Sequence, residues 1–261
     1  PAYTTYAEND YNYILNDCTP SIIFVSNIEQ FNKLKNIIKE KNFIKKIFSF
    51  EKLPYVEIEY INFEDLIQNN NKKDLTIHKS LALRKDPSCI IYTSGTQGNP
   101  KGVILSHGGI LNNCEGAIDI LKPLLSKDQP KFLTWLPLSH SYEHTVQFVQ
   151  ISAGARIFYA QSIDKLVKNM GDCSPEIMTA VPRFYQNLHQ KINASFKKAT
   201  GLKKKLLDKM LELGLKKIKK EKLTIFEKMQ DSILEKLVRK KIKSQFGGSL
   251  KTFVSGGGAL D

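Results

Sequence analysis

The chain has 261 residues, of which 41% are hydrophobic and 10% aromatic, so its composition predicts a folded protein with a sizeable core and excludes a disordered segment. No stretch approaches the roughly eighteen uninterrupted apolar residues of a membrane span, and no signal segment opens the sequence, so we expect a soluble, cytoplasmic protein. The formal net charge is +13, but 18 basic and 6 acidic residues lie between Lys191 and Lys243, so nearly all of the excess charge is local.

Two further features concern the start of the chain and its thiols. Residue 1 is Pro rather than Met, and we therefore expect the chain to be a fragment of a longer protein. The cysteines are spaced too widely for a zinc ribbon or a C-x-x-C redox pair, so we expect buried free thiols. They are Cys18, Cys89, Cys114 and Cys173.

Short runs of β-branched and aromatic residues predict strands, and apolar residues at helical spacing lie between many of them. The alternation predicts an α/β fold of largely parallel sheets covered by helices. A polar connection, residues 69–73, is expected to be a loop. The predicted strands are residues 21–26, 46–50, 88–94, 131–137, 155–160, 176–181 and 250–255. The periodic helical residues are Phe31, Leu34 and Ile38, and then Ile163, Leu166 and Met170.

Ligands of such sheets bind beyond the carboxyl ends of the strands, where loops lead into helices. Four strand ends are therefore candidates for a site: YTSGTQGNPKG, LPLSHSYEH, TAVPRFY and VSGGGALD. The first contains three hydroxyls, two glycines and a lysine, which are the groups that bind a polyphosphate. It is not a Walker A loop, because Pro100 stands where that loop needs glycine and no Ser or Thr follows Lys101. The alternative is a plain surface turn between a strand and a helix.

The pattern Y-T-S-G-T-x-G-x-P-K-G resembles the signature loop of the adenylate-forming enzymes, which include acyl-CoA synthetases, luciferases and peptide-synthetase adenylation domains. The resemblance is closest to long-chain fatty acid–CoA ligases and runs from end to end of the chain. PAYTTYAENDYNYILNDC, WLPLSHSYEHT, VPRFYQNLHQKI and FGGSLKTFVSGGGALD occur in the order and spacing of that group. Residues 1–261 are accordingly expected to be part of an AMP-binding N-terminal domain.

The resemblance implies a two-step reaction in which ATP and a fatty acid form an acyl-adenylate, which coenzyme A then accepts as its thioester. By similarity, Thr93 would approach Mg²⁺ as well as phosphate. The other implied phosphate-binding residues are Ser94, Gly95, Thr96, Gln97, Gly98 and Lys101. The implied adenine and acyl pocket is bordered by His140, Ser255, Gly256, Gly257, Gly258 and Ala259.

The stretch HSYEH, His140 to His144, has the H-x-x-E-H spacing of certain zinc peptidases, in which both histidines bind the metal. A zinc site would need a third ligand and a helix that carries both histidines. Pro137 and Ser139 instead predict that a helix begins at about His140. We therefore expect His140 to line the substrate pocket, with a purely structural role as the alternative.

Several groups that complete the family's reaction do not occur before Asp261. They are a Thr-Glu segment that holds magnesium, an Asp that binds ribose, and a C-terminal lid domain with a catalytic lysine. We therefore expect the chain alone to lack ligase activity and to need a separately encoded or continuing C-terminal part. Two alternatives stay open: an adenylate-forming enzyme for another carboxylate, and a non-catalytic remnant or split subunit.

Residues 191–245 form a Lys-rich segment with two apolar repeats at helical spacing, which predict two amphipathic helices joined near KKIKKEK. One interpretation is a solvated basic face. The other is peripheral docking on anionic lipid, which suits a substrate derived from membranes. We expect no nucleic-acid partner, because the aromatic residues of a stacking surface are not interleaved with the lysines. The repeats are Leu202, Leu206, Met210 and Leu213, and then Phe226, Met229, Ile233 and Leu237.

Overall fold

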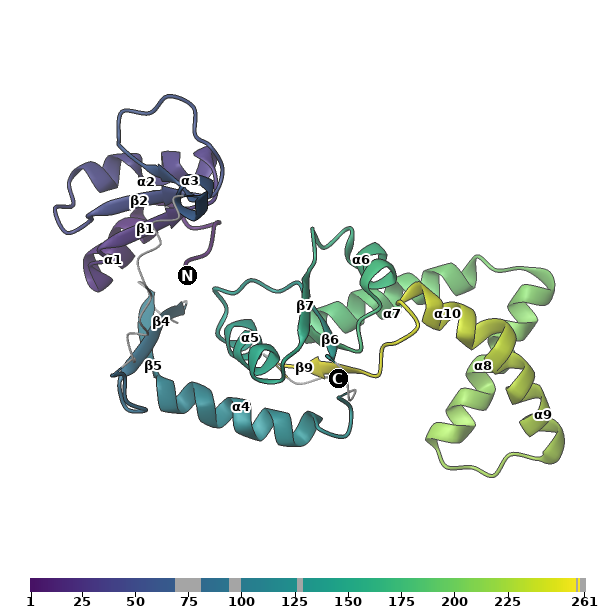
Figure 1. The fold of residues 1–261 in the computed structure, drawn as a ribbon. Coiled ribbons are helices and arrows are strands. Elements are labelled where there is room, and N and C mark those ends of the chain that lie inside the picture. The colour runs from purple at the N-terminus through teal and green to yellow at the C-terminus, as the bar shows by residue number, and fades with distance from the viewer. Residues whose placement is uncertain (69–80, 94–99, 126–128, 257, 259–261) are drawn as a thin grey trace. The chain divides into compact units, whose positions relative to one another are not determined.

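The structure is a computed structural model that describes residues 1–68, 81–93, 100–125, 129–256 and 258 (Figure 1). The chain divides into two compact units, Pro1–Leu111 and Asn112–Asp261, and each is described by itself. Figure 1 colours the chain from its purple N-terminus to its yellow C-terminus. The loop expected at residues 69–73 lies outside the described part of the chain.

The first unit begins with a parallel sheet in the order β1-β2-β3, one face of which is covered by two helices. Along β1 the side chains alternate, so that Ile23 and Val25 are buried against these helices. The second helix starts at Asn27, whose side chain accepts a 3.1 Å hydrogen bond from the N–H of Gln30. The elements are α1 (Glu8–Cys18), β1 (Ile22–Val25), α2 (Ile28–Lys39), β2 (Lys46–Ser49), β3 (Ile61–Asn62) and α3 (Phe63–Gln68).

An antiparallel hairpin of β4 (Pro87–Thr93) and β5 (Lys101–Ser106) completes the first unit, and α4 (His107–Leu121) follows it. The hydroxyl of Tyr92 donates a 2.5 Å hydrogen bond to Asp17, which ties the hairpin to α1. The expectation that the glycine-rich segment leads from a strand into a helix is therefore wrong. The segment joins two antiparallel strands, and the helix comes only after the second.

The second unit is built on a parallel sheet in the order β7-β6-β8-β9. The chain leaves β6 through α5 toward β7 on one side, and then returns through α6 to β8 on the other side of β6. The gap between the ends of β6 and β8 is thus a topological switch point, where sheets of this kind bind ligands. The elements are β6 (Lys131–Thr134), α5 (Ser141–Ser152), β7 (Arg156–Tyr159), α6 (Leu166–Cys173), β8 (Ile177–Ala180) and β9 (Thr252–Ser255).

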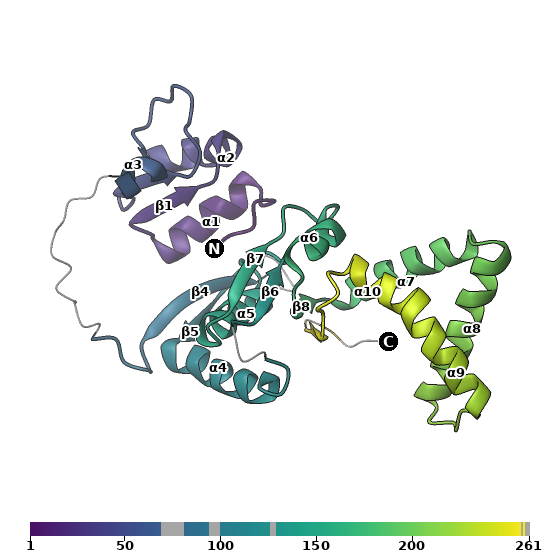
Figure 2. The same cartoon turned by 45° about the vertical axis from the view of Figure 1, so that its right-hand side comes forward.

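The connection from β8 to β9 is a group of helices that lies beyond the sheet (Figure 2). Its own small core is formed by Leu207, Met210, Leu213 and Leu234. The group consists of α7 (Pro182–Lys197), α8 (Gly201–Ile218), α9 (Ile225–Leu234), a π-helical turn η1 (Glu235–Arg239) and α10 (Lys240–Gln245).

The helical group is anchored on the sheet just after α10. Phe246 packs on the core cluster that contains Leu133 and Met178. Gly247 follows with a φ of 81°, and a Cβ there would lie 2.3 Å from the carbonyl oxygen of Met170 on α6. Only glycine fits this left-handed position at such close range.

The predicted α/β class with a Lys-rich helical insertion is confirmed, and a strand overlaps each of the seven predicted ranges. Two strands, β3 and β5, were not predicted. The helix expected to include Ile163 begins only at Leu166, and Ile163 is 70% exposed. Both amphipathic helices are present, but the apolar repeat that begins at Phe226 faces outward, as its exposed side chains show.

Candidate functional site

Three of the four candidate strand ends meet at the carboxyl edge of the sheet in the second unit. Thr134 ends β6, Ala180 ends β8 and Ser255 ends β9, and Ala180 and Ser255 are register partners. Trp135, the first residue after β6, donates a 2.7 Å hydrogen bond from its indole N–H to the carbonyl oxygen of Thr179. The segments that follow β6 and β8 are therefore fastened to each other at the switch point.

The end of β9 is held against the start of α5 by Tyr142. Its hydroxyl donates a 2.8 Å hydrogen bond to the carbonyl oxygen of Val254, and its ring covers Gly256. A Cβ on Gly256 would lie 2.3 Å from the ring, so a larger residue would displace it. Burial, with smaller effects of Glu143 and Tyr185, raises the pKa of Tyr142 to about 12, and the phenol stays a hydrogen-bond donor at neutral pH.

Glu143 points into the protein from the first turn of α5 and is fully buried. Its Oε2 accepts a 2.8 Å hydrogen bond from the Thr179 hydroxyl on β8, while its Oε1 has no hydrogen-bond partner among the described residues. Burial raises the pKa of this carboxyl, and the hydroxyls of Thr179 and Thr134 act in the opposite direction. A buried carboxyl in this setting favours its neutral form more than an exposed one does.

A second buried polar pair, Thr134 and Gln150, lies next to the Glu143 carboxyl. The side chains of Thr134 and Gln150 are hydrogen bonded, with 3.0 Å between Gln150 Nε2 and Thr134 Oγ1. Both side chains are at most 2% exposed. Polar contacts therefore fix α5 to β6 and β8 immediately below the strand ends.

His140 caps the N-terminus of α5, and its Nδ1 accepts a 3.2 Å hydrogen bond from the N–H of Tyr142. When the ring is neutral this bond places the proton on Nε2, because an accepting Nδ1 cannot carry it. The His140 side chain is exposed. The start of α5 thus combines a ring N–H donor with the partial positive charge of a helix N-terminus, a combination that suits an anion.

The H-x-x-E-H residues do not converge. Glu143 faces Thr179, His140 caps the helix, and Nδ1 of His144 lies 3.2 Å from the carbonyl oxygen of Leu138. No group of three or more His, Cys, Asp or Glu able to hold a metal ion occurs among the residues that the structure describes. The H-x-x-E-H spacing is that of the residues at the start of one helix, α5.

Only the two ends of the predicted phosphate loop belong to the described residues. Thr93 and Lys101 are exposed register partners at the loop end of the β4–β5 hairpin, and Pro100 is buried beside them. The loop residues Ser94, Gly95, Thr96, Gln97 and Gly98 lie outside the described part of the chain, as do Gly257 and Ala259 of the triple-glycine motif. Gly258 is exposed.

Sequence reasoning did not single out Tyr142, Thr179, Trp135 or Tyr185 as site residues. Each lies inside a motif that was quoted: Thr179 and Trp135 at or next to a strand end, and Tyr142 and Tyr185 in the first turn of a helix that follows. Burial raises the pKa of the Tyr185 phenol, and the Ser255 hydroxyl acts in the opposite direction. Position near a strand end was the available signal, because residues there are the ones that a switch point brings together.

Comparison with known proteins shows which family this chain belongs to. The model of a family described as AMP-binding enzyme matches residues 1–261. The peroxisomal long chain acyl-CoA synthetase 6 of Arabidopsis thaliana is 26% identical over 269 residues, which cover 100% of this chain and 37% of the relative. The long-chain-fatty-acid–CoA ligase 5 of Mus musculus is 32% identical over 174 residues, which cover 66% of this chain and 24% of the relative.

Solved structures support the fold. The adenylation domain of a carboxylate reductase from Mycobacterium chelonae is similar with a TM-score of 0.68 and 16% identity, covering 100% of this chain and 39% of that one. A putative long-chain-fatty-acid CoA ligase from Rhodopseudomonas palustris has a TM-score of 0.57 and 18% identity, covering 69% and 43%. The matched part of this chain covers between 24% and 43% of the length of these proteins.

Proposed function

Because this chain belongs to the family of AMP-binding enzymes, we propose that it is part of an enzyme that uses ATP to convert a long-chain fatty acid into its acyl-adenylate and then into its coenzyme A thioester. The long-chain acyl-CoA synthetases that match the whole chain support the choice of substrate. The chain covers 37% and 40% of two of them, so the complete reaction is a proposal about the protein to which it contributes.

The observation that carries the proposal is the meeting of β6, β8 and β9 at the switch point, with the N-terminus of α5 beside it. An acyl-adenylate carries an anionic phosphate next to a flat base and a long apolar chain. The α5 N-terminus and the His140 Nε2–H would hold the negative charge of the α-phosphate and of the attacking carboxylate. The main chain of Ser255 to Ala259 would border the adenine and the acyl chain.

In the first unit, the loop between Thr93 and Lys101 is the proposed phosphate-binding segment. Lys101, with the amides and hydroxyls of Ser94 to Gly98, would hold the β- and γ-phosphates and stabilise pyrophosphate as it leaves. Charge-assisted bonds that strengthen along this step lower its barrier, whereas equal binding of substrate and transition state would not.

Magnesium fits the donor set that the chain offers. Mg²⁺ prefers oxygen ligands and usually keeps several from water and phosphate, so a single protein hydroxyl such as that of Thr93 is compatible with it. When bound, the ion would neutralise phosphate charge. Most of its ligands would then come from the nucleotide rather than from the described residues of the chain.

We place this enzyme in the cytoplasm, with peripheral contact to the inner face of an anionic membrane. All four cysteines are free, which suits a reducing compartment. Among the residues that the structure describes, none of the helices has the length and apolar character needed to cross a membrane. A fatty acid substrate partitions into lipid, and an enzyme at the surface meets it there.

Binding of a stable acyl-adenylate analogue to the 261-residue chain tests the proposal. Titration calorimetry with palmitoyl sulfamoyl adenosine should give a dissociation constant at least tenfold lower than that of the acetyl analogue. Equal affinity for both would favour an enzyme for another carboxylate. Binding of neither, by a chain shown to be folded by circular dichroism, would favour a non-catalytic subunit.

A further inference from the structure

The outer face of α9 and η1 presents a row of large apolar side chains that nothing covers among the described residues. Its members follow one another at helical spacing and so lie on one side of the helix. They are Phe226 (62% exposed), Met229 (55%), Ile233 (47%) and Leu237 (61%). Ile225, the first residue of α9, is also large, apolar and 89% exposed.

The acidic side chains of the same helix point the other way and are neutralised within the helical group. Glu227 lies 2.5 Å from Lys216, and Asp231 is paired with Lys217 and, at 2.7 Å, with Arg239. Glu235 pairs with Arg239 at 3.3 Å. The only carboxylates of α9 and η1 are therefore engaged by cations, and Leu234 on their side is buried in the core.

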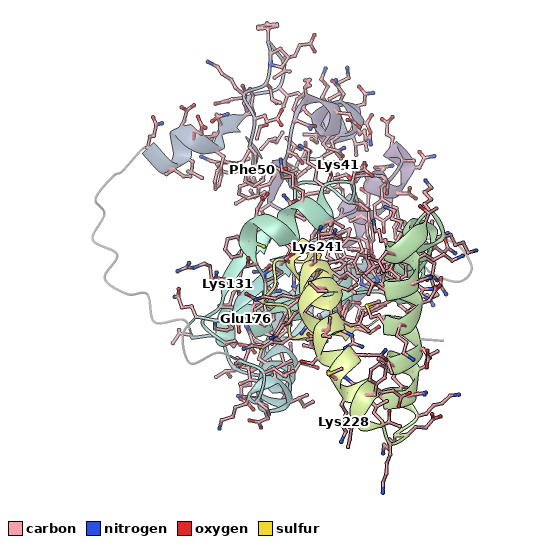
Figure 3. All side chains as sticks on the ribbon, turned by 90° about the vertical axis from the view of Figure 1, so that its right-hand side faces the viewer. Lys41, Phe50, Lys131, Glu176, Lys228 and Lys241 are labelled. Atoms are coloured by element: carbon pink, nitrogen blue, oxygen red, sulfur yellow. The ribbon has the colours of Figure 1, made fainter. Side chains whose placement is uncertain are left out.

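The lysines on α9, η1 and the start of α10, and those that precede α9 in the chain, are not neutralised in this way. Each is exposed, and none forms an ion pair with any described residue. Figure 3 looks at the helical group from its outer side and marks Lys228 on α9 and Lys241 on α10. The lysines are Lys219, Lys220, Lys222, Lys228, Lys236, Lys240 and Lys241.

We infer that the row Phe226, Met229, Ile233 and Leu237, with these lysines, is a docking surface for an anionic membrane. An amphipathic helix of this composition lies in the plane of the lipid headgroups, with its apolar side chains inserted and its lysines against anionic lipid. Neither feature alone requires this occupant: an uncharged partner would not need the lysines, and a free polyanion would not need the apolar row. A bilayer surface with anionic lipid meets both.

The inference names the surface that would make the proposed peripheral contact, but its test needs no acyl substrate or nucleotide. Failure of acyl-adenylate binding would therefore leave it intact, and failure of membrane binding would leave the site at the switch point intact.

Sedimentation of the full 261-residue chain with vesicles tests the docking surface. Phosphatidylcholine vesicles that contain one part in three of phosphatidylglycerol should bind at least tenfold more tightly than vesicles of phosphatidylcholine alone. Added salt should weaken this binding, because the lysine part is screened. Equal binding to both kinds of vesicle, or binding to neither, would overturn the inference.

Two sets of variants separate the charged and apolar contributions. The triple variant Lys228→Gln, Lys236→Gln, Lys240→Gln should lose at least tenfold in affinity, while Lys35→Gln, Lys46→Gln, Lys52→Gln, with the same change of charge on the first unit, should not. The double variant Phe226→Gln, Met229→Gln should also lose at least tenfold, although its charge is unchanged. Its control is Tyr55→Gln, Ile163→Gln, which removes two other exposed apolar side chains.

The row faces solvent, so these variants should fold, and circular dichroism verifies that they do. Vesicle binding that resists Phe226→Gln, Met229→Gln and is displaced equally by heparin would show a plain polyanion surface and overturn the inference. So would a dimer in the ultracentrifuge that this variant dissociates while vesicle binding stays at background, since the row would then be a contact between copies of the chain.

Discussion

The hydroxyl of Tyr142 on α5 donates a 2.8 Å hydrogen bond to the carbonyl oxygen of Val254 on β9, across 112 positions of sequence. The same ring lies against Gly256. One side chain thus joins the helix that follows the central strand β6 to the edge strand β9, and it shapes the carboxyl edge between them.

Removing that hydroxyl should weaken the second unit. Tyr142→Phe is expected to lower the free energy of unfolding by about 1 kcal/mol, because a partly buried carbonyl loses its donor. Urea denaturation measures the change. Tyr159→Phe is the matched control, since Tyr159 is 59% exposed and water can replace the hydrogen bond that its hydroxyl donates to Gln147. An equal loss in both variants would contradict the special role of Tyr142.

A methyl group on Gly256 should force the Tyr142 ring away. Gly256→Ala is expected to cost about 1–3 kcal/mol in thermal or urea unfolding, as overpacked sites do. Gly258→Ala should be nearly neutral, because among the described residues its Cβ would meet only Pro182 Cγ, at 3.5 Å. The double variant Tyr142→Ala, Gly256→Ala should lose less stability than the sum of the losses of the two single variants, because the two sites are coupled. Strict additivity of the two changes would show that the ring and the glycine do not compete for space.

The buried carboxyl of Glu143 should make stability depend on pH in one direction. Its pKa in the folded state is raised above its ordinary value of 4.5, so above that pH the folded protein binds more protons than the unfolded chain. The free energy of unfolding therefore falls as the pH rises from 4.5 through the folded pKa. Glu143→Gln removes this contribution, and its stability relative to the unaltered chain should improve over that range.

Urea unfolding of both proteins between pH 4.5 and 8 measures this difference. Glu57→Gln is the control with the opposite sign, because a hydrogen bond from Lys39 lowers the pKa of the exposed Glu57 carboxyl. That variant should gain nothing as the pH rises. Parallel pH profiles for the Glu143→Gln variant and the unaltered chain would show that this carboxyl has an ordinary pKa.

The phosphate-binding role of Lys101 can be tested on the chain without catalysis. Lys101→Met should reduce the affinity for ATP or pyrophosphate by ten- to a hundredfold, since a charge-assisted hydrogen bond contributes about 1.5–3 kcal/mol. Lys85→Met, at another exposed lysine of the same unit, should leave the affinity unchanged. Calorimetric titration in the presence of Mg²⁺ compares the two, and equal affinities would remove Lys101 from the proposed site.

The strands were predictable where a run of β-branched or aromatic residues fills a buried strand, as in residues 176–181. β5 escaped because Lys101 and Gly102 open it and because its pairing partner is set by the hairpin rather than by its own pattern. β3 is only two residues long and leaves no periodic signal. Local sequence therefore predicted the buried elements and missed those that depend on pairing alone.

In the candidate site, too, only the features that depend on local sequence could be predicted. The position of His140 at a helix start was confirmed, because Pro137 and Ser139 carry that signal locally. The direction of the Glu143 side chain could not be predicted, because its hydrogen-bond partner Thr179 is 36 positions away on β8. Local sequence does not show which strand lies opposite α5. The apolar repeat at Phe226 shows the converse: helical spacing predicted the helix correctly but could not tell which side of it is buried.

The π-turn η1 gives the helical group one place that accommodates a change of length. A π-turn holds one residue more than an α-turn, so deleting a single residue from Glu235–Arg239 would let the helix run on with regular α geometry. The helix after the turn would keep nearly the same orientation, so Phe246 would stay packed on the sheet and Gly247 would keep its narrow place beside Met170. The same deletion within α9 would instead turn everything after it by about 100° around the helix axis.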